Sequence, residues 1–241
     1  MRTKILKQPI DVYTKEEVQY IVKAALAEPK QLRIVTLNPE MVITAFNNFE
    51  LQAAINNADL IVPDGTGIVW ALKKEGISDA KRIPGIELTE VMLDSGNKLG
   101  KKVAIFGSNK DTLKKATYNL SKKYPDINFV KTIDGYQGKE KDTDIAIEIS
   151  KENPDIILVA LGTPNQEVWI NKHYKLFPKS ILIGVGGSID IFSGEKKRAP
   201  LWIRENNLEW VYRMITEPKR TIRILSSLPV FILKTLMKTN N

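Results

Sequence analysis

Short runs of aliphatic and β-branched residues alternate with amphipathic stretches of helical periodicity along most of this chain. Each apolar run ends in glycine, proline, asparagine or aspartate, and the stretches that follow carry the capping residues or early prolines with which helices begin. Strands that alternate with helices form βαβ units, whose strands are parallel and whose sheet is covered on both faces. The expected fold is therefore α/β and Rossmann-like, with a mainly parallel sheet and helices on both faces. The expected strands span residues 33–37, 59–65, 101–107, 127–136, 155–162 and 180–187, and the expected helices span 14–28, 39–48, 49–58, 66–76, 84–100, 108–125, 139–154 and 163–177.

The alternation stops near residue 195, where the composition of the chain changes. Residues 196–241 contain ten lysines and arginines but three acidic residues, so this segment carries +7 of the formal net charge of +8. The segment is also rich in tryptophan, isoleucine and leucine. Positive charge interleaved with apolar bulk at helical spacing is typical of helices that lie on an anionic membrane surface. We therefore predict a body formed by residues 1–195 and a C-terminal, helical, membrane-binding appendage formed by residues 196–241.

Several classes of protein are disfavoured by what the chain lacks. No stretch reaches the roughly 20 apolar residues of a membrane-spanning helix, and the N-terminus lacks the apolar core of a signal peptide. The absence of cysteine excludes disulfides, thiolate nucleophiles and cysteine-ligated zinc. The one histidine, His173, lies in a polar helical stretch with no GxSxG motif nearby. We expect it to be a surface residue and not a member of a catalytic triad.

Ligands of open parallel sheets bind beyond the carboxyl ends of the strands. In this chain those ends carry Asn38, Asp64, Gly107, Tyr136 and Gly186. Several of these corners open a helix, where free N–H groups and the helix dipole favour phosphate, so we expect a nucleotide or another phosphorylated ligand. Asp64 has no cationic neighbour in the sequence and is a candidate general base, although an ordinary turn residue is the alternative.

Other motifs narrow the possibilities. Neither GxGxxG nor GxxxxGK[ST] occurs at these corners, which argues against dinucleotide and P-loop sites. The Asp142-Thr143-Asp144 triplet matches a DxD metal motif, but it precedes a helix, where aspartate and threonine are ordinary N-caps. We therefore predict no metal site.

Three arginines of the appendage, Arg213, Arg220 and Arg223, are spaced by seven and three residues. One continuous helix would bring them onto nearly one face, but Pro218 makes a continuous helix doubtful. Such a cluster can bind pyrophosphate, lipid head groups or nucleic acid.

Seven segments, from about Thr36 to Arg223, carry a likeness to a known family. They are TLNPEM, IVPDGTGIVW, RIPGIEL, VAIFGS, IILVALGTPNQEVW, GVGGSIDIFSGEKKRAP and NLEWVYRMITEPKR. In this order they resemble the WecG/TagA/CpsF family of bacterial glycosyltransferases, and within it the branch of wall teichoic acid linkage-unit synthesis. The PDGTG motif and the C-terminal run are specific in combination.

The resemblance implies an inverting, metal-independent and cofactor-free transfer of N-acetylmannosamine from UDP-N-acetylmannosamine. The acceptor would be the C4 hydroxyl of N-acetylglucosamine on undecaprenyl pyrophosphate, at the cytoplasmic face of the membrane, where the protein would be peripheral. It also implies roles for individual residues. Asp64 would be the general base; Thr36, Asn38, Arg82, Gly107, Tyr136, Gln166, Gly186 and Asp190 would bind substrate; and Arg213, Arg220 and Arg223 would meet the pyrophosphates.

Three alternatives remain open from the sequence. One is a relative in the same family that uses UDP-N-acetylmannosaminuronic acid, another is a non-catalytic nucleotide-binding Rossmann protein, and a third is a nucleic-acid-binding protein. The appendage is too apolar for a purely electrostatic binder, so we expect no nucleic acid partner. Self-association away from the membrane is a further expectation, because the appendage exposes apolar side chains.

Overall fold

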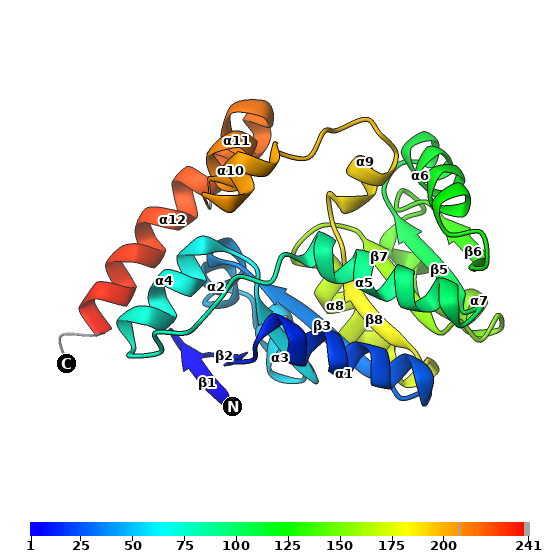
Figure 1. Ribbon diagram of the computed structural model, residues 1–241, viewed down its shortest axis with the longest axis horizontal. Helices are drawn as coiled ribbons and strands as arrows, with labels where there is room; N and C mark the ends of the chain where they lie inside the picture. The colour runs from blue at the N-terminus through cyan, green and yellow to red at the C-terminus, as the bar shows by residue number, and fades with distance from the viewer. Residues whose placement is uncertain (207, 239–241) are drawn as a thin grey trace.

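The computed structural model describes residues 1–206 and 208–238, apart from the side chains of residues 218–220, 223 and 238. Its centre is a six-stranded sheet in the order β4-β3-β8-β7-β5-β6, and every pair of neighbouring strands is parallel. The predicted α/β fold with a parallel sheet is therefore confirmed (Figure 1). The strands of this sheet are β3 (Leu32–Leu37), β4 (Leu60–Pro63), β5 (Lys102–Gly107), β6 (Asn128–Ile133), β7 (Ile156–Ala160) and β8 (Ile181–Gly184).

Helices cover both faces of the sheet because alternate side chains of each strand point to opposite faces. Val103 and Ile105 of β5 pack in one core cluster, whereas Ala104 and Phe106 pack in another. The first face is covered by α1 (Lys15–Ala27), α5 (Gly85–Lys98) and α6 (Lys110–Lys123). The second is covered by α2 (Pro39–Ala45), α3 (Phe49–Asn56), α4 (Thr66–Lys74), α7 (Asp142–Ser150) and α8 (Asn165–His173). The short elements η1 (Lys139–Lys141), η2 (Tyr174–Leu176) and α9 (Ser188–Phe192) lie in the connections.

Three of the helices, α1, α2 and α6, begin where the capping residues of the sequence predict. Thr14 and Glu17 form a complete capping box at the start of α1. Asn38 caps α2, which has Pro39 at its first position, and Asn109 caps α6. These local signals place the end of each strand next to the start of a helix, and so they form the edge at which a ligand can bind.

An N-terminal hairpin was not predicted. It consists of β1 (Arg2–Ile5) and β2 (Gln8–Asp11), which pair antiparallel. Asp11 fixes it to the body, since its carboxylate accepts hydrogen bonds from Arg2 at 2.7 Å and from the N–H of Ile61 at 2.9 Å.

The C-terminal segment forms α10 (Leu201–Glu205), α11 (Glu209–Thr216) and α12 (Pro218–Lys238), which pack against the body beside α2 and α4 (Figure 1). As the position of Pro218 indicated, no continuous helix joins Arg213 and Arg223, because α11 ends at Thr216 and α12 begins at Pro218. Phe231 of α12 is completely buried in the core cluster that contains Met41 of α2 and Ile68 of α4. In this structure the C-terminal segment is therefore docked on the body.

Two expectations from the sequence are wrong. His173 is 5% exposed and packs against Trp169, with ring centroids 5.2 Å apart. Burial lowers its pKa, and the charge of Lys172 acts in the same direction. At the start of α7 the N-cap is Lys141 with no side-chain capping bond, so Asp142 begins the helix and does not cap it.

Candidate active site

The carboxyl ends of β3, β4, β7 and β8 surround a polar cavity of about 130 Å³. Because these four strands are parallel, their ends meet at one edge, and the loops that follow them contribute most of the walls. Arg213 reaches the same cavity from α11. The predicted residues that line this cavity are Thr36, Asn38, Asp64, Arg82, Gln166, Gly186 and Arg213.

Asp64 is held at the mouth of this cavity by its backbone. Its N–H donates to the carbonyl of Leu37 at 2.9 Å, and its own carbonyl accepts from Nε of Arg82. The carboxylate is 28% exposed, accepts from the N–H of Gly85 at 3.3 Å, and lies 3.7 Å from the guanidinium of Arg82. One face of the carboxylate is therefore oriented by the protein while part of it stays accessible to a substrate.

Three helices point uncapped N-termini toward this region. The residues before α4, α5 and α8 are Gly65, Pro84 and Pro164, and none of them makes a side-chain capping bond. The N–H groups of Gly85 and Gln166 donate to Asp64 and to the Gly162 carbonyl, and the other first-turn N–H groups and the helix dipoles give this edge a positive potential that favours an anionic ligand. Thr36 abuts the start of α5, because a Cβ on Gly85 would lie 3.3 Å from the Thr36 hydroxyl.

Gln166 fixes the floor of the cavity. Its Oε1 accepts hydrogen bonds from the N–H groups of Gly162 and Gly186, both at 3.1 Å, and so it joins the loops that follow β7 and β8. Its Nε2 donates to Glu167 at 2.7 Å, which determines which way the amide faces. A side chain on Gly184 would overlap Gln166, so glycine is required there.

Glu167 is an acidic residue buried behind the cavity, at 4% exposure. Burial raises its pKa to about 7, although hydrogen bonds from Gln166 and Thr163 act in the opposite direction. The charge of Glu40 raises the pKa further. Oε2 of Glu167 has no hydrogen-bond partner within the part of the chain that the structure describes. Its carboxyl group therefore titrates near neutral pH. The neighbouring residue in the chain is Gln166, whose side-chain amide forms the floor of the cavity.

Glu209 connects α11 to the site. It is 2% exposed, and its carboxylate accepts hydrogen bonds from Arg82 at 2.8 Å and from Arg213 at 2.6 Å. Burial alone would raise the pKa of Glu209, but the positive charges of Arg213 and Arg82 outweigh it and hold the pKa below its usual value. Since Arg82 also contacts Asp64, the C-terminal helices and the candidate base share one network of ionic contacts.

A second cavity, of about 370 Å³, lies on the other side of Asp64 and is mostly apolar. Asn38, Asp64, Arg82 and Arg213 line both cavities, so the two meet at the candidate base. The apolar walls come from α2, α4, α11 and α12, through Pro39, Trp70, Trp210, Ile224, Leu228 and Ile232.

The remaining predicted residues lie apart from these two cavities. Tyr136 is 81% exposed and lines a separate hollow of about 670 Å³ between the β6 and β7 ends. Gly107 has a φ of +124° and sits against the backbone of Ala160, so this corner requires glycine. Asp190 pairs with Lys196 at 2.6 Å. The side chains of Arg220 and Arg223 lie outside the described residues.

The model of the family described as "Glycosyl transferase WecG/TagA/CpsF family" matches residues 3–241. The chain belongs to this family. It is 36% identical over 224 residues to the N-acetylglucosaminyldiphosphoundecaprenol N-acetyl-beta-D-mannosaminyltransferase of Bacillus subtilis (strain 168), covering 93% of this chain and 86% of that protein. It is 40% identical over 203 residues to the protein of the same name in Staphylococcus aureus (strain NCTC 8325 / PS 47), covering 84% of this chain and 79% of that one. The resemblance noted in the sequence is thereby confirmed.

In this WecG/TagA/CpsF glycosyltransferase, two residues of the site were not predicted from the sequence. Glu209 lies between Leu208 and Trp210 in NLEWVY, whereas Glu167 follows polar residues and precedes Val168 and Trp169 in PNQEVW. For Glu209, an acidic residue with apolar neighbours on both sides is a signal of burial, because a buried carboxylate requires a partner or a shifted pKa. Among the described residues, no helix is long and apolar enough to cross a bilayer.

Proposed function

We propose that this chain transfers N-acetylmannosamine from UDP-N-acetylmannosamine to the C4 hydroxyl of N-acetylglucosamine carried on undecaprenyl diphosphate. The relatives in Bacillus subtilis and Staphylococcus aureus are named for N-acetyl-beta-D-mannosaminyl transfer to N-acetylglucosaminyldiphosphoundecaprenol. We assign the reaction of this chain to the synthesis of the wall teichoic acid linkage unit. One observation supports it most directly: Asp64 lies where a polar cavity with uncapped helix N-termini meets an apolar cavity. The positive potential of the first favours the phosphate groups of a sugar donor, and a lipid-linked acceptor approaches from the second.

In the proposed reaction the carboxylate of Asp64 accepts the proton of the acceptor hydroxyl as that oxygen attacks C1 of the donor sugar. The new C1–O bond forms as the bond between C1 and the β-phosphate oxygen breaks, and UDP departs with the electron pair. Attack from the face opposite the leaving group inverts the anomeric centre and yields a β-linked product. A general base positioned in this way contributes about 10²–10⁴ to the rate.

The departing diphosphate requires positive charge, which Arg82 and Arg213 provide at the cavity wall. Guanidinium groups bind phosphate bidentately, and the amides at the starts of α4, α5 and α8 add fixed dipoles. Arg220 and Arg223, in the first turns of α12, are proposed to join them. In this proposal these groups, and no metal ion or cofactor, balance the charge of UDP.

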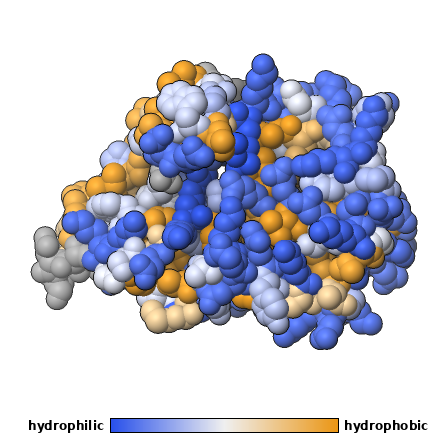
Figure 2. Space-filling view, viewed as in Figure 1, coloured by the Kyte–Doolittle hydropathy of each residue, from blue (hydrophilic) through white to orange (hydrophobic). Residues whose placement is uncertain are grey.

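The surface of the C-terminal helices fits a peripheral protein at the inner face of the membrane. Ile215, Ile222 and Met237 are 77%, 73% and 63% exposed, and Trp202 of α10 is 62% exposed. In Figure 2 hydrophobic side chains gather along the edge that α11 and α12 form. We propose that residues 196–241 bind an anionic bilayer and complete the site of the catalytic domain, residues 1–195, and that they mediate homo-oligomer formation away from the membrane.

The alternatives from the sequence have less support. The names of the relatives specify N-acetyl-beta-D-mannosaminyl transfer and not transfer of the uronic acid. Offering UDP-N-acetylmannosaminuronic acid alongside UDP-N-acetylmannosamine, and determining the mass of the product, distinguishes the two donors.

The proposed role of Asp64 is tested by Asp64→Asn, which keeps the shape of the side chain but cannot accept the proton. Turnover with a lipid-linked N-acetylglucosamine acceptor should fall by about 10²-fold or more, while UDP binding by calorimetry is retained. Asp144→Asn, in the exposed first turn of α7, is the matched control and should keep full activity with and without a chelator. If Asp64→Asn stays within a few-fold of the wild type, Asp64 is not the base.

A further inference from the structure

The cavity below α12 is more apolar than the reaction at Asp64 requires. The sugars and phosphates of both substrates are polar, whereas most of this 370 Å³ space is walled by tryptophan, proline, isoleucine and leucine side chains. Contact between an apolar wall and a sugar hydroxyl contributes no binding free energy, whereas covering hydrocarbon contributes about 25 cal/mol per Å² of apolar surface removed from water. The cavity therefore favours an apolar ligand at a position that adjoins the catalytic carboxylate.

The charged groups that the two cavities share, Asp64, Arg82 and Arg213, lie where the apolar cavity joins the polar one. The wall that α12 forms consists of Ile224, Leu228 and Ile232, with Ser227 as its polar residue. A ligand with a negatively charged head and a hydrocarbon chain matches this division: the guanidinium groups meet the head, and the apolar walls meet the chain.

The helix α12 has apolar residues on two opposite sides. Phe231 is 0% exposed and faces the body, while Ile222 and Leu233 are 73% and 59% exposed. Ile232 lines the cavity and is itself 38% exposed, so the cavity reaches the surface beside the exposed apolar side of α12. A hydrocarbon chain can pass from that surface into the cavity without crossing a polar region.

We propose, on the basis of the function proposed above, that this cavity binds the diphosphate-proximal isoprenoid units of the acceptor lipid. If a methylene-sized group occupies about 30 Å³, as a water molecule does, a five-carbon unit needs on the order of 150 Å³. The cavity then holds about two to three units of the polyprenyl chain. The rest of the polyprenyl chain stays in the bilayer, and the protein contacts only the first isoprene units.

The test uses acceptors that share N-acetylglucosamine diphosphate and differ in chain length, from a methyl ester through one, two, three and four isoprene units. They are assayed with UDP-N-acetylmannosamine in solution, without vesicles and below the concentration at which they form micelles. With the full-length wild type, kcat/KM should rise by about tenfold or more per unit up to the second or third unit and then remain constant.

Two substitutions should change this profile in opposite ways. Leu228→Trp fills the cavity, so the gain should end at an earlier unit and kcat/KM for the three-unit acceptor should fall by about tenfold or more. Trp70→Leu enlarges the cavity, so the plateau should move to a longer chain. Leu233→Trp, the same change on the exposed side of α12, should keep the wild-type profile, and thermal unfolding shows that each variant is folded.

The outcomes separate this inference from the function on which it rests. If sugar is transferred but kcat/KM does not depend on chain length, or all variants share one profile, the cavity does not bind the chain. A gain that continues without a plateau to four units also contradicts the inference, because a cavity of this size is then not the site. If no acceptor of any length receives sugar, the proposed function itself is wrong.

Discussion

Replacing Glu209 with alanine should loosen the attachment of α11 and α12 to the body of the protein. Its carboxylate is 2% exposed and accepts two charge-assisted hydrogen bonds, at 2.8 Å from Arg82 and 2.6 Å from Arg213. Breaking a buried ionic contact costs about 3–5 kcal/mol because the partner charge stays desolvated. The two guanidinium groups are 16% and 24% exposed, so water can replace part of the loss. We therefore expect about 3 kcal/mol, the lower end of that range.

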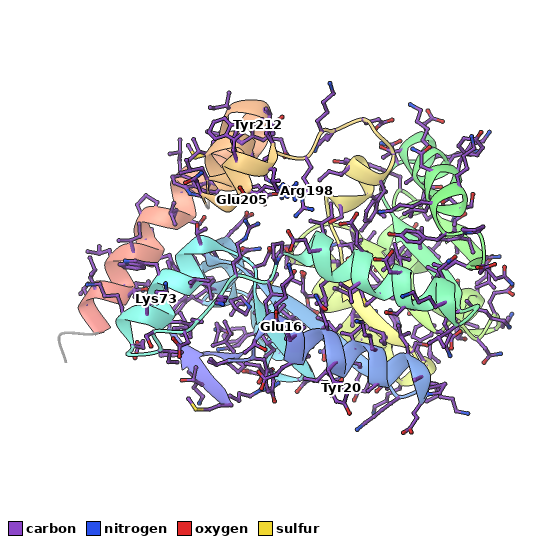
Figure 3. The ribbon with its side chains drawn as sticks, viewed as in Figure 1. Glu16, Tyr20, Lys73, Arg198, Glu205 and Tyr212 are labelled. Atoms are coloured by element: carbon purple, nitrogen blue, oxygen red, sulfur yellow. The ribbon has the colours of Figure 1, made fainter. Side chains whose placement is uncertain are left out.

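Two measurements detect this loss. For a chain of this length each kcal/mol shifts Tm by about 2–4 °C, so a global effect would lower Tm by about 6–12 °C. If the C-terminal helices detach before the body unfolds, the same free energy appears as faster amide hydrogen exchange confined to α11 and α12. Glu205→Ala, at an exposed position of α10, is the control for removing a glutamate from the same segment (Figure 3).

The contribution of Glu209 should also depend on pH. Its pKa is lower in the folded protein than in the unfolded chain, so its stabilisation is present above the unfolded pKa and is lost as pH falls through the folded pKa. The difference between the wild type and Glu209→Gln should therefore shrink in acid. A double-mutant cycle that combines Glu209→Ala with Arg82→Ala tests the ionic contact directly. If the two changes in the free energy of unfolding are purely additive, or if Glu209→Ala lowers Tm no more than Glu205→Ala does, the ionic contact does not hold α11 on the body.

Two further predictions concern buried side chains. The raised pKa of Glu167, about 7 in the folded protein against a model-peptide value of 4.5, means that the fold holds a proton that the unfolded chain releases. The contribution of Glu167 to the free energy of unfolding should therefore be largest below pH 4.5 and fall by roughly 3 kcal/mol as pH rises through 7. Glu167→Gln should flatten this pH dependence when urea unfolding is compared at pH 5 and pH 8. An equal pH dependence in both proteins would contradict the assignment. Phe231→Ala removes a completely buried ring and should cost about 3–5 kcal/mol, with increased proteolysis within α12, whereas Leu233→Ala, at an exposed position, should change stability by less than about 0.5 kcal/mol.

The parallel sheet was predictable because a strand buried on both faces is an uninterrupted apolar run. The run IILVA, for example, becomes β7, whose five residues are all buried. The N-terminal hairpin was not predictable for a local reason. Its turn places Leu6 and Lys7 at φ values of +46° and +73°, a conformation in which glycine or asparagine would be expected. The usual sequence signal for a tight hairpin is therefore absent.

Some residues of the candidate site were predictable from the sequence and others were not. Asp64 was identified because it follows a strand, and the ends of parallel strands meet at one edge whatever the strand order is, whereas Gln166 was identified through the family resemblance. The role of Glu209 could not be predicted, because its partner Arg82 lies 127 residues away in the sequence. Ionic contacts between distant segments depend on how the C-terminal helices dock, which no local pattern specifies.

Arg198 illustrates the same limit. It lies in the connection between α9 and α10, and its guanidinium group donates a hydrogen bond to Glu87 of α5 at 2.6 Å (Figure 3). Burial alone would raise the pKa of Glu87, but Lys15 and Arg198 outweigh it and lower that pKa. In the sequence Arg198 is one of several neighbouring cations, and only the structure distinguishes this fixed cation from its exposed neighbour Lys197.

Because all six strands of the sheet run in one direction, the turns at their amino ends lie on the side of the molecule opposite Asp64. Leu99, in the turn that precedes β5, is 48% exposed there, and a Cβ added to the neighbouring Gly100 would meet no described residue within 4 Å apart from its chain neighbours. The chain has no cysteine of its own, so one introduced at Leu99 would be the single attachment point for a fluorophore. Energy transfer from that label to dyes in a vesicle would then report how the protein is oriented on the lipid while the reacting edge stays unmodified.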